Sequence, residues 1–398
     1  MLKEKNILLC ISGGIAAYKI ATLASMLKKA GANVTTIMTE HATEFIAPLT
    51  FETLTGNRCV VGMFDRDFKY DVKHISLAKS ADLIVIAPAT ANIIAKLAHG
   101  IADDMLTTTV IASTAPKLVV PAMNTNMYHN PITQDNIKTL KKYDFDVIDA
   151  ASGYLACGDT GDGKMPEPED IYEHILRYLA MPHDLAGKKV LVTAGPTQEA
   201  IDPVRYITNH STGKMGYAIA KAAMLRGAEV TLVSGETSLK PPMFVKTINI
   251  KSAADMYEAV MSHADESDFI FKAAAVADYT PTTVADNKIK KKDEDMSIPL
   301  RRTQDILKSL GEKRKPGQVI CGFSMETENM VENSRAKLAK KNIDMIIANN
   351  LKVEGAGFGT DTNVITVITK DSCDELEKMS KFDAANAIID RALDISGR

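Results

Sequence analysis

The chain alternates short apolar strands with small-residue turns and helices, and it begins this alternation twice. NILLCI (residues 6–11) predicts a buried strand, the glycines after it a turn, and IAAYKIATLASMLKKAG (15–31) a helix with apolar side chains at helical spacing and a C-terminal glycine. A second strand, NVTTIM, follows at 33–38. Repeated strand–helix–strand order is typical of a parallel sheet with helices on both faces, and it leaves few other architectures open.

The same order starts again at KKVLVTAGPT (188–197) and continues to NVITVIT (363–369). A chain of 398 residues also exceeds the length at which one hydrophobic core stops growing. We therefore expect an α/β fold with two doubly wound, Rossmann-like domains and mainly parallel sheets, spanning 1–187 and 188–398. The residues from Asp371 onward are expected to form two short amphipathic helices.

Composition excludes several classes of protein. No apolar run reaches the roughly 18–20 residues of a membrane-spanning helix, and the apolar run at the N-terminus is too short for a signal peptide. Five scattered cysteines without a CxxC pair argue against a disulfide framework and a structural zinc site, so we expect a cytoplasmic protein. The net charge of −3 provides no field for nucleic acid, which leaves small molecules as the expected partners.

Doubly wound sheets bind ligands beyond the carboxyl ends of their strands. In the first half this principle selects four loops: Ser12–Gly14, Thr39–His41, Ala87–Thr90 and Pro121–Asn124. SGGIAAYK (12–19) joins a strand to a helix whose first N–H groups can bind phosphate, and a turn needed only for tight geometry is the alternative. The stretch is not GxGxxG, which favours a mononucleotide over a dinucleotide.

Three further residues of the first half carry candidate chemistry. His74 precedes the strand LIVIA, and the alternative role is that of a surface or capping residue. Asn124 follows a strand in PAMN, where an Asx-rich turn that caps the helix following Pro131 is the alternative. Cys157 lies in GYLACGDTGDGKMPEP (153–168), a glycine-rich stretch able to fold over a site as a lid. A thiol on such a loop favours a nucleophile or proton donor over a structural cysteine.

In this order SGGIAAYK, His74, PAMN and LACGDTGDGKM resemble the flavin-dependent cysteine decarboxylases, most closely those that act on phosphopantothenoylcysteine. The resemblance implies His74 as the catalytic base, Asn124 as the residue that binds the substrate carboxylate, and Cys157 as the proton donor. Two positions depart from the family pattern, because Lys164 replaces an arginine and Tyr128 replaces a tryptophan. The implied cofactor is FMN, expected at Ser12, Gly13, Gly14, Thr39, Ala87 and Thr90.

The implied chemistry needs an electron sink, because loss of CO2 from a plain carboxylate would leave an unstabilised carbanion. By the resemblance, FMN oxidises the thiol-bearing carbon to a thioaldehyde, and loss of CO2 then gives an enethiolate. Reduced flavin returns a hydride while Cys157, on a closing lid, protonates the adjacent carbon.

The second half contains a long polar loop, TAGPTQEAIDPVRYITNHSTGKMG (193–216), before a helix expected to begin near Met215. Its composition favours an ordered active-site loop over a linker, and the absence of GxxxxGK[ST] rules out a Walker motif. Asp278 follows a strand of small residues, where it could meet a metal-bound phosphate or simply begin a turn. Lys288 and Lys290 in NKIKKKDED would share a face of an extended segment, against the alternative of a solvated charged hairpin.

Together GPT, DPVR, ITNHSTGKMG, AAVAD, KIKK and GFSMETE resemble phosphopantothenate–cysteine ligases, which occur joined to the decarboxylase in bifunctional proteins of coenzyme A biosynthesis. The resemblance implies that CTP, with Mg²⁺ held by Asp278, cytidylylates the carboxylate of 4′-phosphopantothenate before the cysteine amine attacks. Asn209 would handle the acyl-nucleotide and Lys288 would serve the amide-forming step. The implied CTP contacts are Lys272, Ala273, Ala274, Asp278, Lys288, Gln304, Asp305, Ile306, Leu307, Phe323, Lys337 and Lys341.

The resemblance thus implies a bifunctional enzyme that makes 4′-phosphopantetheine, with ligation first and decarboxylation second. One alternative is an NAD(P)-dependent oxidoreductase, disfavoured by the missing GxGxxG. The other is a catalytically inactive flavin-binding regulatory subunit, which would be expected to lose Cys157 or the KIKK lysines. Family members assemble from trimers and dimers, so the resemblance also implies a homo-oligomer.

Overall fold

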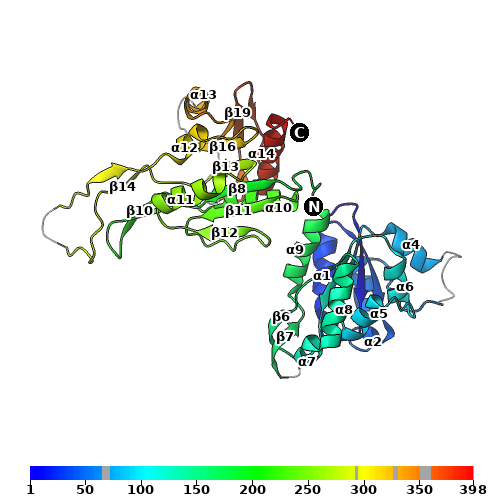
Figure 1. Cartoon of the computed structure of the whole chain (residues 1–398). Helices are drawn as coiled ribbons and strands as arrows, with labels where there is room; N and C mark the ends of the chain where they lie inside the picture. Colours follow the sequence, from blue (N-terminus) through cyan, green and yellow to red (C-terminus); the bar gives the residue numbers. More distant parts are fainter. Residues whose placement is uncertain (65–71, 157, 292–294, 326–329, 350–359, 398) are drawn as a thin grey trace. The chain divides into compact units, whose positions relative to one another are not determined.

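The computed structural model describes residues 1–64, 72–156, 158–291, 295–325, 330–349 and 360–397. The chain divides into two compact units, Met1–Met181 and Pro182–Arg398 (Figure 1). This boundary lies a few residues before the expected one, because Asp184 and Leu185 already bond to the second unit. The Asp184 carboxylate pairs with the Arg226 guanidinium at 2.5 Å, and the Leu185 N–H donates to the Arg226 carbonyl at 3.0 Å.

The first unit is built on a five-stranded parallel sheet with the strand order β2-β1-β3-β4-β5. Its central strands are fully buried apolar runs, as helices on both faces require. Strand order reverses between β1 and β3, which is the switch point at which doubly wound sheets bind ligands. The strands are β1 (Asn6–Ile11), β2 (Asn33–Met38), β3 (Leu83–Ala89), β4 (Lys117–Pro121) and β5 (Phe145–Val147), followed by the antiparallel hairpin β6 (Ala151–Tyr154) and β7 (Thr160–Lys164).

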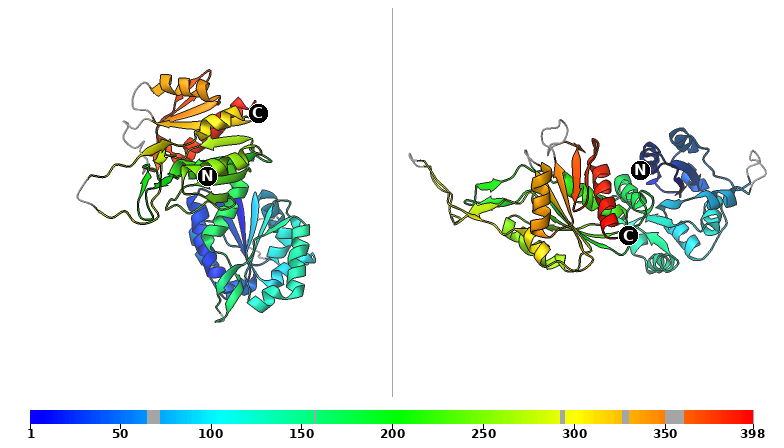
Figure 2. Two further views of the ribbon diagram at one scale, coloured as in Figure 1. Left: turned by 60° about the vertical axis from the view of Figure 1, so that its left-hand side comes forward. Right: turned by 90° about the horizontal axis from the view of Figure 1, so that it is seen from above.

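The helices of the first unit cover both faces of the sheet. Helix α1 packs with α3 and α9 on one face, while α5, α6 and α8 enclose the apolar core on the other, as the left view of Figure 2 shows. The bounds are α1 (Ala17–Lys29), α2 (Glu40–Thr43), α3 (Pro48–Thr55), α4 (Lys73–Ser80), α5 (Ala91–Ala98), α6 (Met105–Ala112), α7 (Thr125–His129), α8 (Pro131–Lys142) and α9 (Pro168–Leu179).

The second unit has an eight-stranded sheet with the order β12-β11-β8-β13-β16-β17-β19-β20. Pairs from β12 to β17 are parallel, and β19 and β20 extend the sheet in antiparallel fashion. The switch point lies between β8 and β13. The strands are β8 (Lys189–Ala194), β11 (Glu229–Ser234), β12 (Lys246–Asn249), β13 (Phe269–Lys272), β16 (Val319–Met325), β17 (Met345–Asn349), β19 (Ile365–Thr369) and β20 (Cys373–Glu375).

Two short antiparallel pairs project from one side of this sheet (Figure 1). They are β9 (Gln198–Ala200) with β10 (Tyr206–Thr208), and β14 (Tyr279–Pro281) with β15 (Leu300–Arg302). A third pair joins β18 (Thr362–Asn363) to β21 (Met379–Ser380). The helices are α10 (Lys214–Leu225) and α14 (Lys381–Ile395), which pack together, and α11 (Ala253–Ala264), α12 (Ile306–Glu312) and α13 (Met330–Lys341), which enclose the second apolar core.

The expected α/β fold with mostly parallel sheets is confirmed, and helix α10 begins at Lys214, next to its expected start. The prediction of two short helices after Asp371 is wrong. The tail forms β20, β21 and a single helix, α14. Strand β20 exists because it pairs with the edge strand β19, a partner that the local sequence does not reveal.

Candidate active sites of the two units

In the first unit, Ser12 joins the two loops that meet at the switch point. Its hydroxyl donates to the Pro88 carbonyl at 2.7 Å, and its oxygen accepts from the Thr90 N–H at 3.1 Å. Its own N–H donates to the same Pro88 carbonyl at 3.3 Å. The buried serine therefore fixes the start of the SGG loop against the end of β3.

Gly13 lies where no side chain fits. A Cβ atom there would come within 2.6 Å of the His41 Cβ and 2.9 Å of the His41 carbonyl carbon. A Cβ atom at Gly14 would find its nearest neighbour, Thr90 Cγ2, at 3.7 Å. Helix α1 follows without a side-chain cap, although the Ala17 N–H donates to the Gly14 carbonyl at 3.0 Å and the Lys19 N–H donates to the Ala16 carbonyl at 3.1 Å. The tight glycine turn and the positive end of the helix fit the phosphate end of a flavin mononucleotide.

The other expected flavin residues lie at the same edge of the sheet. Thr39 follows β2 and caps α2, and its N–H donates to the Ile11 carbonyl at 3.0 Å. Thr90 follows β3 and caps α5. The structure thus brings Ser12, Thr39 and Thr90 to the ends of three adjacent strands. Ala87 is buried within β3, so its side chain belongs to the core and only its main chain is left for a ligand.

His74 is the second residue of α4 and is half-buried. Helix α4 ends just before β3 begins, so its first turn lies toward the carboxyl edge of the sheet, where the flavin loops are. The segment 65–71 before it lies outside the described residues. The structure therefore places His74 toward the expected side of the sheet.

Asn124 follows β4 and has two hydrogen-bonding roles. Its Oδ1 accepts from the Asn126 N–H at 2.9 Å, an Asx turn that caps the short helix α7 and not the helix after Pro131 that the alternative expected. Its Nδ2 donates to Asp159 Oδ2 at 3.4 Å, in the turn between β6 and β7. Helix α8 has a separate cap, Asn130. The amide of Asn124 thus faces the stretch expected to act as a lid.

The β6–β7 hairpin, which forms this stretch, is docked on the PAMN loop. The Met123 N–H donates to the Gly163 carbonyl at 2.9 Å. Gly163 has φ +108°, and a Cβ atom there would come within 2.4 Å of the Met123 carbonyl oxygen. The close contact requires glycine at this position. Cys157, between β6 and β7 in the sequence, lies outside the described residues.

Ion pairs hold both ends of this hairpin, and sequence reasoning missed them. His129 Nε2 lies 3.1 Å from Asp162 Oδ2. Glu167, just after β7, pairs with Lys19 at 2.7 Å and with Lys164 at 3.1 Å. Lys19, and then Lys164, hold the pKa of the Glu167 carboxyl below its usual range. Lys164 is only three residues from Glu167, but no pattern within one segment could have indicated Lys19 as its second partner.

In the second unit, Thr193 and Thr197 join the loops at the switch point. Thr193 Oγ1 accepts from the Ala274 N–H at 3.1 Å, and Thr197 Oγ1 accepts from the Ala277 N–H at 3.0 Å. Asn209 Nδ2 donates to the Ala275 carbonyl at 3.2 Å. The long loop after β8 is therefore an ordered structure, bonded along the loop that carries Asp278.

A cavity of about 500 Å³ opens at this point. It brings together Asn209, Lys272, Ala273, Ala274, Asp278 and Phe323 from the expected site. Lys214 of the long polar loop also lines it, together with Asn363 and Lys381, which the sequence did not single out. Lys381 comes from the tail after Asp371, to which the sequence analysis gave no function.

Three lysines, Lys214, Lys272 and Lys381, give this cavity its positive charge. Burial, followed by the nearby Lys341, lowers the pKa of Lys272 to about 8. Burial, followed by Lys214, lowers the pKa of Lys381. Burial of a cation costs free energy unless an opposite charge compensates it. The buried lysines therefore indicate an anionic ligand.

The remaining expected nucleotide contacts lie around α12 and α13. Lys341 pairs with Asp305 at 3.1 Å, and Lys337 donates to Ser324 Oγ at 3.4 Å. The side chains of Ile306 and Leu307 are buried in the apolar core, so only their main chain is left for a nucleotide. These residues do not line the 500 Å³ cavity.

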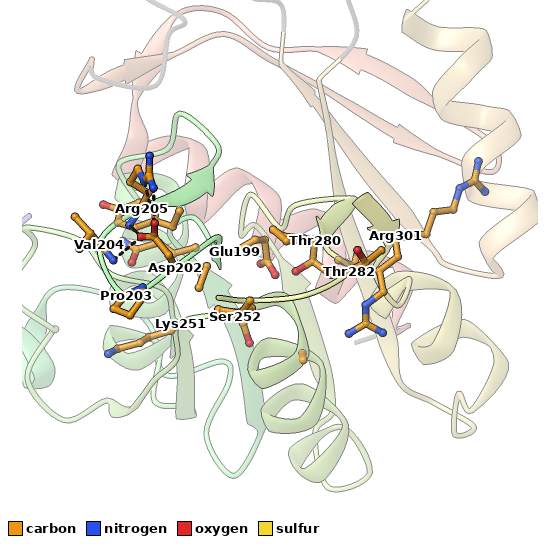
Figure 3. Close-up of a pocket in the computed structure, with 18 of the residues that line it drawn as sticks. Glu199, Asp202, Pro203, Val204, Arg205, Lys251, Ser252, Thr280, Thr282 and Arg301 are labelled. Carbon is orange, nitrogen blue, oxygen red and sulfur yellow. Dashed lines mark hydrogen bonds and ion pairs between the residues drawn. The ribbon is translucent and has the colours of Figure 1, made fainter. Parts of the chain in front are cut away.

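A second cavity of about 870 Å³ lies beside the β9–β10 hairpin, between β14 and the start of α11 (Figure 3). Gln304 lines this cavity and not the first. Lys288 lines neither and lies on an exposed segment without regular structure. The solvated-hairpin alternative is therefore half right, since the segment is solvated but forms no hairpin strand among its described residues.

The described residues place two limits on other sites. None of their helices is long and apolar enough to cross a membrane. Within the same ranges, no group of three or more His, Cys, Asp or Glu side chains could hold a metal ion.

Two family models cover almost the entire chain. Residues 1–180 match the model described as Flavoprotein, and residues 185–395 match the DNA/pantothenate metabolism flavoprotein C-terminal domain. The fold and its switch-point sites therefore define a flavoprotein joined to a pantothenate-metabolism domain.

Individual relatives sharpen this class. The coenzyme A biosynthesis bifunctional protein CoaBC of Bacillus subtilis (strain 168) is 51% identical over 98% of this chain and 97% of its own. A cysteine/cysteine sulfinic acid decarboxylase of an unknown prokaryotic organism is 44% identical over 87% of this chain and 99% of its own. A crystal structure of the C-terminal domain of a CoaBC protein is 44% identical, covers 54% of this chain and 98% of that one, and has a TM-score of 0.46.

The chain belongs to the family of bifunctional coenzyme A biosynthesis proteins, whose members are decarboxylases and ligases. Its first unit is a flavoprotein. Family membership replaces the alternative of an NAD(P)-dependent oxidoreductase.

Proposed function

We propose that the second unit joins cysteine to 4′-phosphopantothenate with CTP, and that the first unit then decarboxylates the adduct with FMN to give 4′-phosphopantetheine. The observation that carries the proposal is the difference between the two switch points. The first has a glycine loop and an uncapped helix start, suited to the phosphate of a bound cofactor. The second has a lysine-lined cavity, suited to a nucleoside triphosphate.

In the ligation, the substrate carboxylate attacks the α-phosphorus of CTP and pyrophosphate leaves. The cysteine amine then attacks the acyl-cytidylate and CMP leaves. Lys272 and Lys381 would balance the charge on the phosphates, and Asp278 would hold Mg²⁺, which would neutralise further phosphate charge. Mg²⁺ is commonly held by one or two carboxylates plus substrate phosphates, which fits a lone exposed carboxylate. Asn209 would contact the acyl-cytidylate and Lys288 would serve the amide-forming step.

In the decarboxylation, FMN would supply an electron sink and later return the electrons. Asn124 would hold the substrate carboxylate through the amide that now faces Asp159. His74 would remove a proton, and Cys157 would supply one to the carbon that CO2 has left. The docked hairpin would exclude water during these steps.

The proposal includes a cytoplasmic homo-oligomer. Four large apolar side chains of the first unit are exposed around α1 to α3: Ile15, Tyr18, Phe45 and Leu49. Such a group favours burial against another copy of the chain. Sedimentation of the purified protein would show a single assembled species if this holds, and a monomer would refute it.

Mass spectrometry of the products tests the proposed function directly. The purified protein is mixed with 4′-phosphopantothenate, cysteine, CTP and Mg²⁺, and with ATP in place of CTP in a parallel reaction. A product that contains cysteine minus CO2, formed with CTP, supports both activities and their order. An intact cysteine adduct that accumulates supports the ligase alone.

The decarboxylase relative motivates one control. Cysteine is incubated with the protein in the absence of 4′-phosphopantothenate and CTP. Release of CO2 from free cysteine at a rate similar to that from the adduct would contradict the proposed substrate of the first unit.

A further inference from the structure

The carboxylate of Asp202, at the tip of the β9–β10 hairpin, is buried and fully engaged. Its side chain has 0% exposed surface. Oδ1 accepts from the Val204 N–H at 2.8 Å and the Arg205 N–H at 2.9 Å. Oδ2 accepts from Arg205 Nε at 3.0 Å and Nη2 at 2.6 Å. Figure 3 shows Asp202 and Arg205 together at one end of the 870 Å³ cavity, away from Arg301.

The same two side chains hold the main chain of Ile289 on both sides. The Ile289 N–H donates to Asp202 Oδ2 at 3.1 Å, and Arg205 Nη2 donates to the Ile289 carbonyl at 2.9 Å. Each of these groups belongs to a planar peptide unit, one shared with Lys288 and one with Lys290. Fixing both planes therefore fixes the Cα atoms of Lys288 and Lys290, although their side chains are exposed.

The hairpin that provides this clamp also carries Asn209. Strand β10 ends at Thr208, whose hydroxyl donates to the Thr197 carbonyl at 2.8 Å, and Asn209 follows directly. The Ala285 N–H donates to the Ile201 carbonyl at 3.0 Å and gives the Lys288 segment a second attachment to the hairpin. One rigid element thus connects the two residues proposed for the ligase chemistry.

We propose that Asp202 is a positioning residue of the ligation: with Arg205 it clamps the main chain of Ile289 and thereby holds Lys288 in a fixed relation to Asn209. This inference rests on the proposed role of Lys288. Asp202 itself is buried under its own partners and acts through Arg205 and Ile289.

The clamp depends on the negative charge of Asp202. The Arg205 guanidinium first, and then main-chain N–H groups, hold the pKa of this carboxyl well below its usual range, so it is ionised at neutral pH. All five bonds are donated to the carboxylate. An asparagine in its place would present one NH2 group, which cannot accept, toward at least two of these donors.

The experiment separates the two halves of the ligation in the Asp202→Asn variant of the full chain. CTP and 4′-phosphopantothenate without cysteine give a burst of pyrophosphate that reports acyl-cytidylate formation, and added cysteine then reports amide formation. We expect amide formation to slow by about 10- to 100-fold, the effect of a small misplacement of a reacting group. The amplitude of the burst should stay unchanged, which also shows that the second unit is folded.

Asp286→Asn is the matched control, because it removes the same charge from the exposed segment two residues before Lys288 without touching the clamp. It should form the amide at the wild-type rate. Arg205→Lys is a second clamp variant for the case in which Asp202→Asn shows no burst. It keeps a cation beside Asp202 but loses the fork that reaches both Asp202 and Ile289, so it too should slow amide formation.

A double-mutant cycle with Lys288→Ala decides between positioning and a merely structural role. If the clamp acts through Lys288, the double variant should be no slower in amide formation than Lys288→Ala alone. If the rate losses of the two single variants multiply in the double variant, the clamp does not act through Lys288. The clamp is also refuted if Asp202→Asn forms the amide at the wild-type rate while Lys288→Ala is slow. Both outcomes leave the proposed function intact. A wild-type rate in Lys288→Ala would refute the role of Lys288 and the clamp's purpose with it.

Discussion

The two units place their first strand beside the same kind of switch point, but the loop that follows this strand differs in length. Residues 12–16 separate β1 from α1, whereas residues 195–213 separate β8 from α10. In the proposed function, the short loop offers the helix start and the glycine main chain to the cofactor phosphate. The long loop folds into a hairpin and presents side chains. The proposal thus assigns recognition by main chain to the first unit and recognition by charge to the second.

The largest effects should come from separating the two chemistries. His74→Asn should lower decarboxylation at least about 100-fold, because it removes the proposed base, while ligation continues. Lys288→Ala should lower ligation, while decarboxylation of supplied adduct continues. Mass spectrometry would then detect accumulated 4′-phosphopantothenoylcysteine with the first variant only. If His74→Asn released CO2 at the wild-type rate, the base would have to be found elsewhere.

The comparison also shows what sequence could predict. Buried parallel strands are apolar runs that end in small residues, so the sheets, and the loops carrying Ser12, Thr90, Asn209 and Asp278, followed from local patterns. The elements that could not be predicted from the sequence depend on partners far away in the chain. Strands of three residues, such as β9 and β14, are too short to show a period.

Three particular residues illustrate this limit. Asp202 stood out only as part of the DPVR motif, and its contact with the main chain of Ile289 became visible only in the structure. Lys381 begins a helix of the tail, yet it lines the cavity beside Lys272. Leu307 was expected at the nucleotide, but its side chain is in the core. Each outcome is set by tertiary contacts that no single segment encodes.

The next effect tests recognition by main chain in the first unit. Gly163→Ala should lower kcat/KM of decarboxylation about tenfold more than Gly158→Ala. Both positions have positive φ, which costs about 1–3 kcal/mol for alanine. A Cβ atom added at Gly163 would also come within 2.4 Å of the Met123 carbonyl oxygen. A Cβ atom added at Gly158 would find its nearest neighbour, Tyr154 Oη, at 3.9 Å. Steady-state kinetics with supplied adduct would measure the difference, and equal losses would show that hairpin docking is unimportant.

A smaller effect tests recognition by charge in the second unit. Lys272, with a pKa of about 8, loses its proton as the pH rises above that value. Triphosphate binding favours the protonated form, so KM for CTP should rise up to about tenfold per pH unit above 8. Lys272→Arg keeps its charge and should give a flatter profile over pH 8–9.5. An identical rise in both proteins would assign the titration to another group.

The smallest effect concerns the ion pairs of Glu167 at the base of the hairpin. Glu167→Gln should raise KM of decarboxylation only about two- to fivefold, because partly exposed pairs contribute roughly 0.2–1 kcal/mol. The carboxyl has a lowered pKa in the folded protein, so its contribution is present above its unfolded pKa and is lost as the pH falls through the folded value. Wild type and variant should therefore converge in acid, and they should also converge at high salt, which screens such pairs. A difference that survives both conditions would mean that Glu167 acts through the second accepting oxygen that glutamine lacks, and not through its charge.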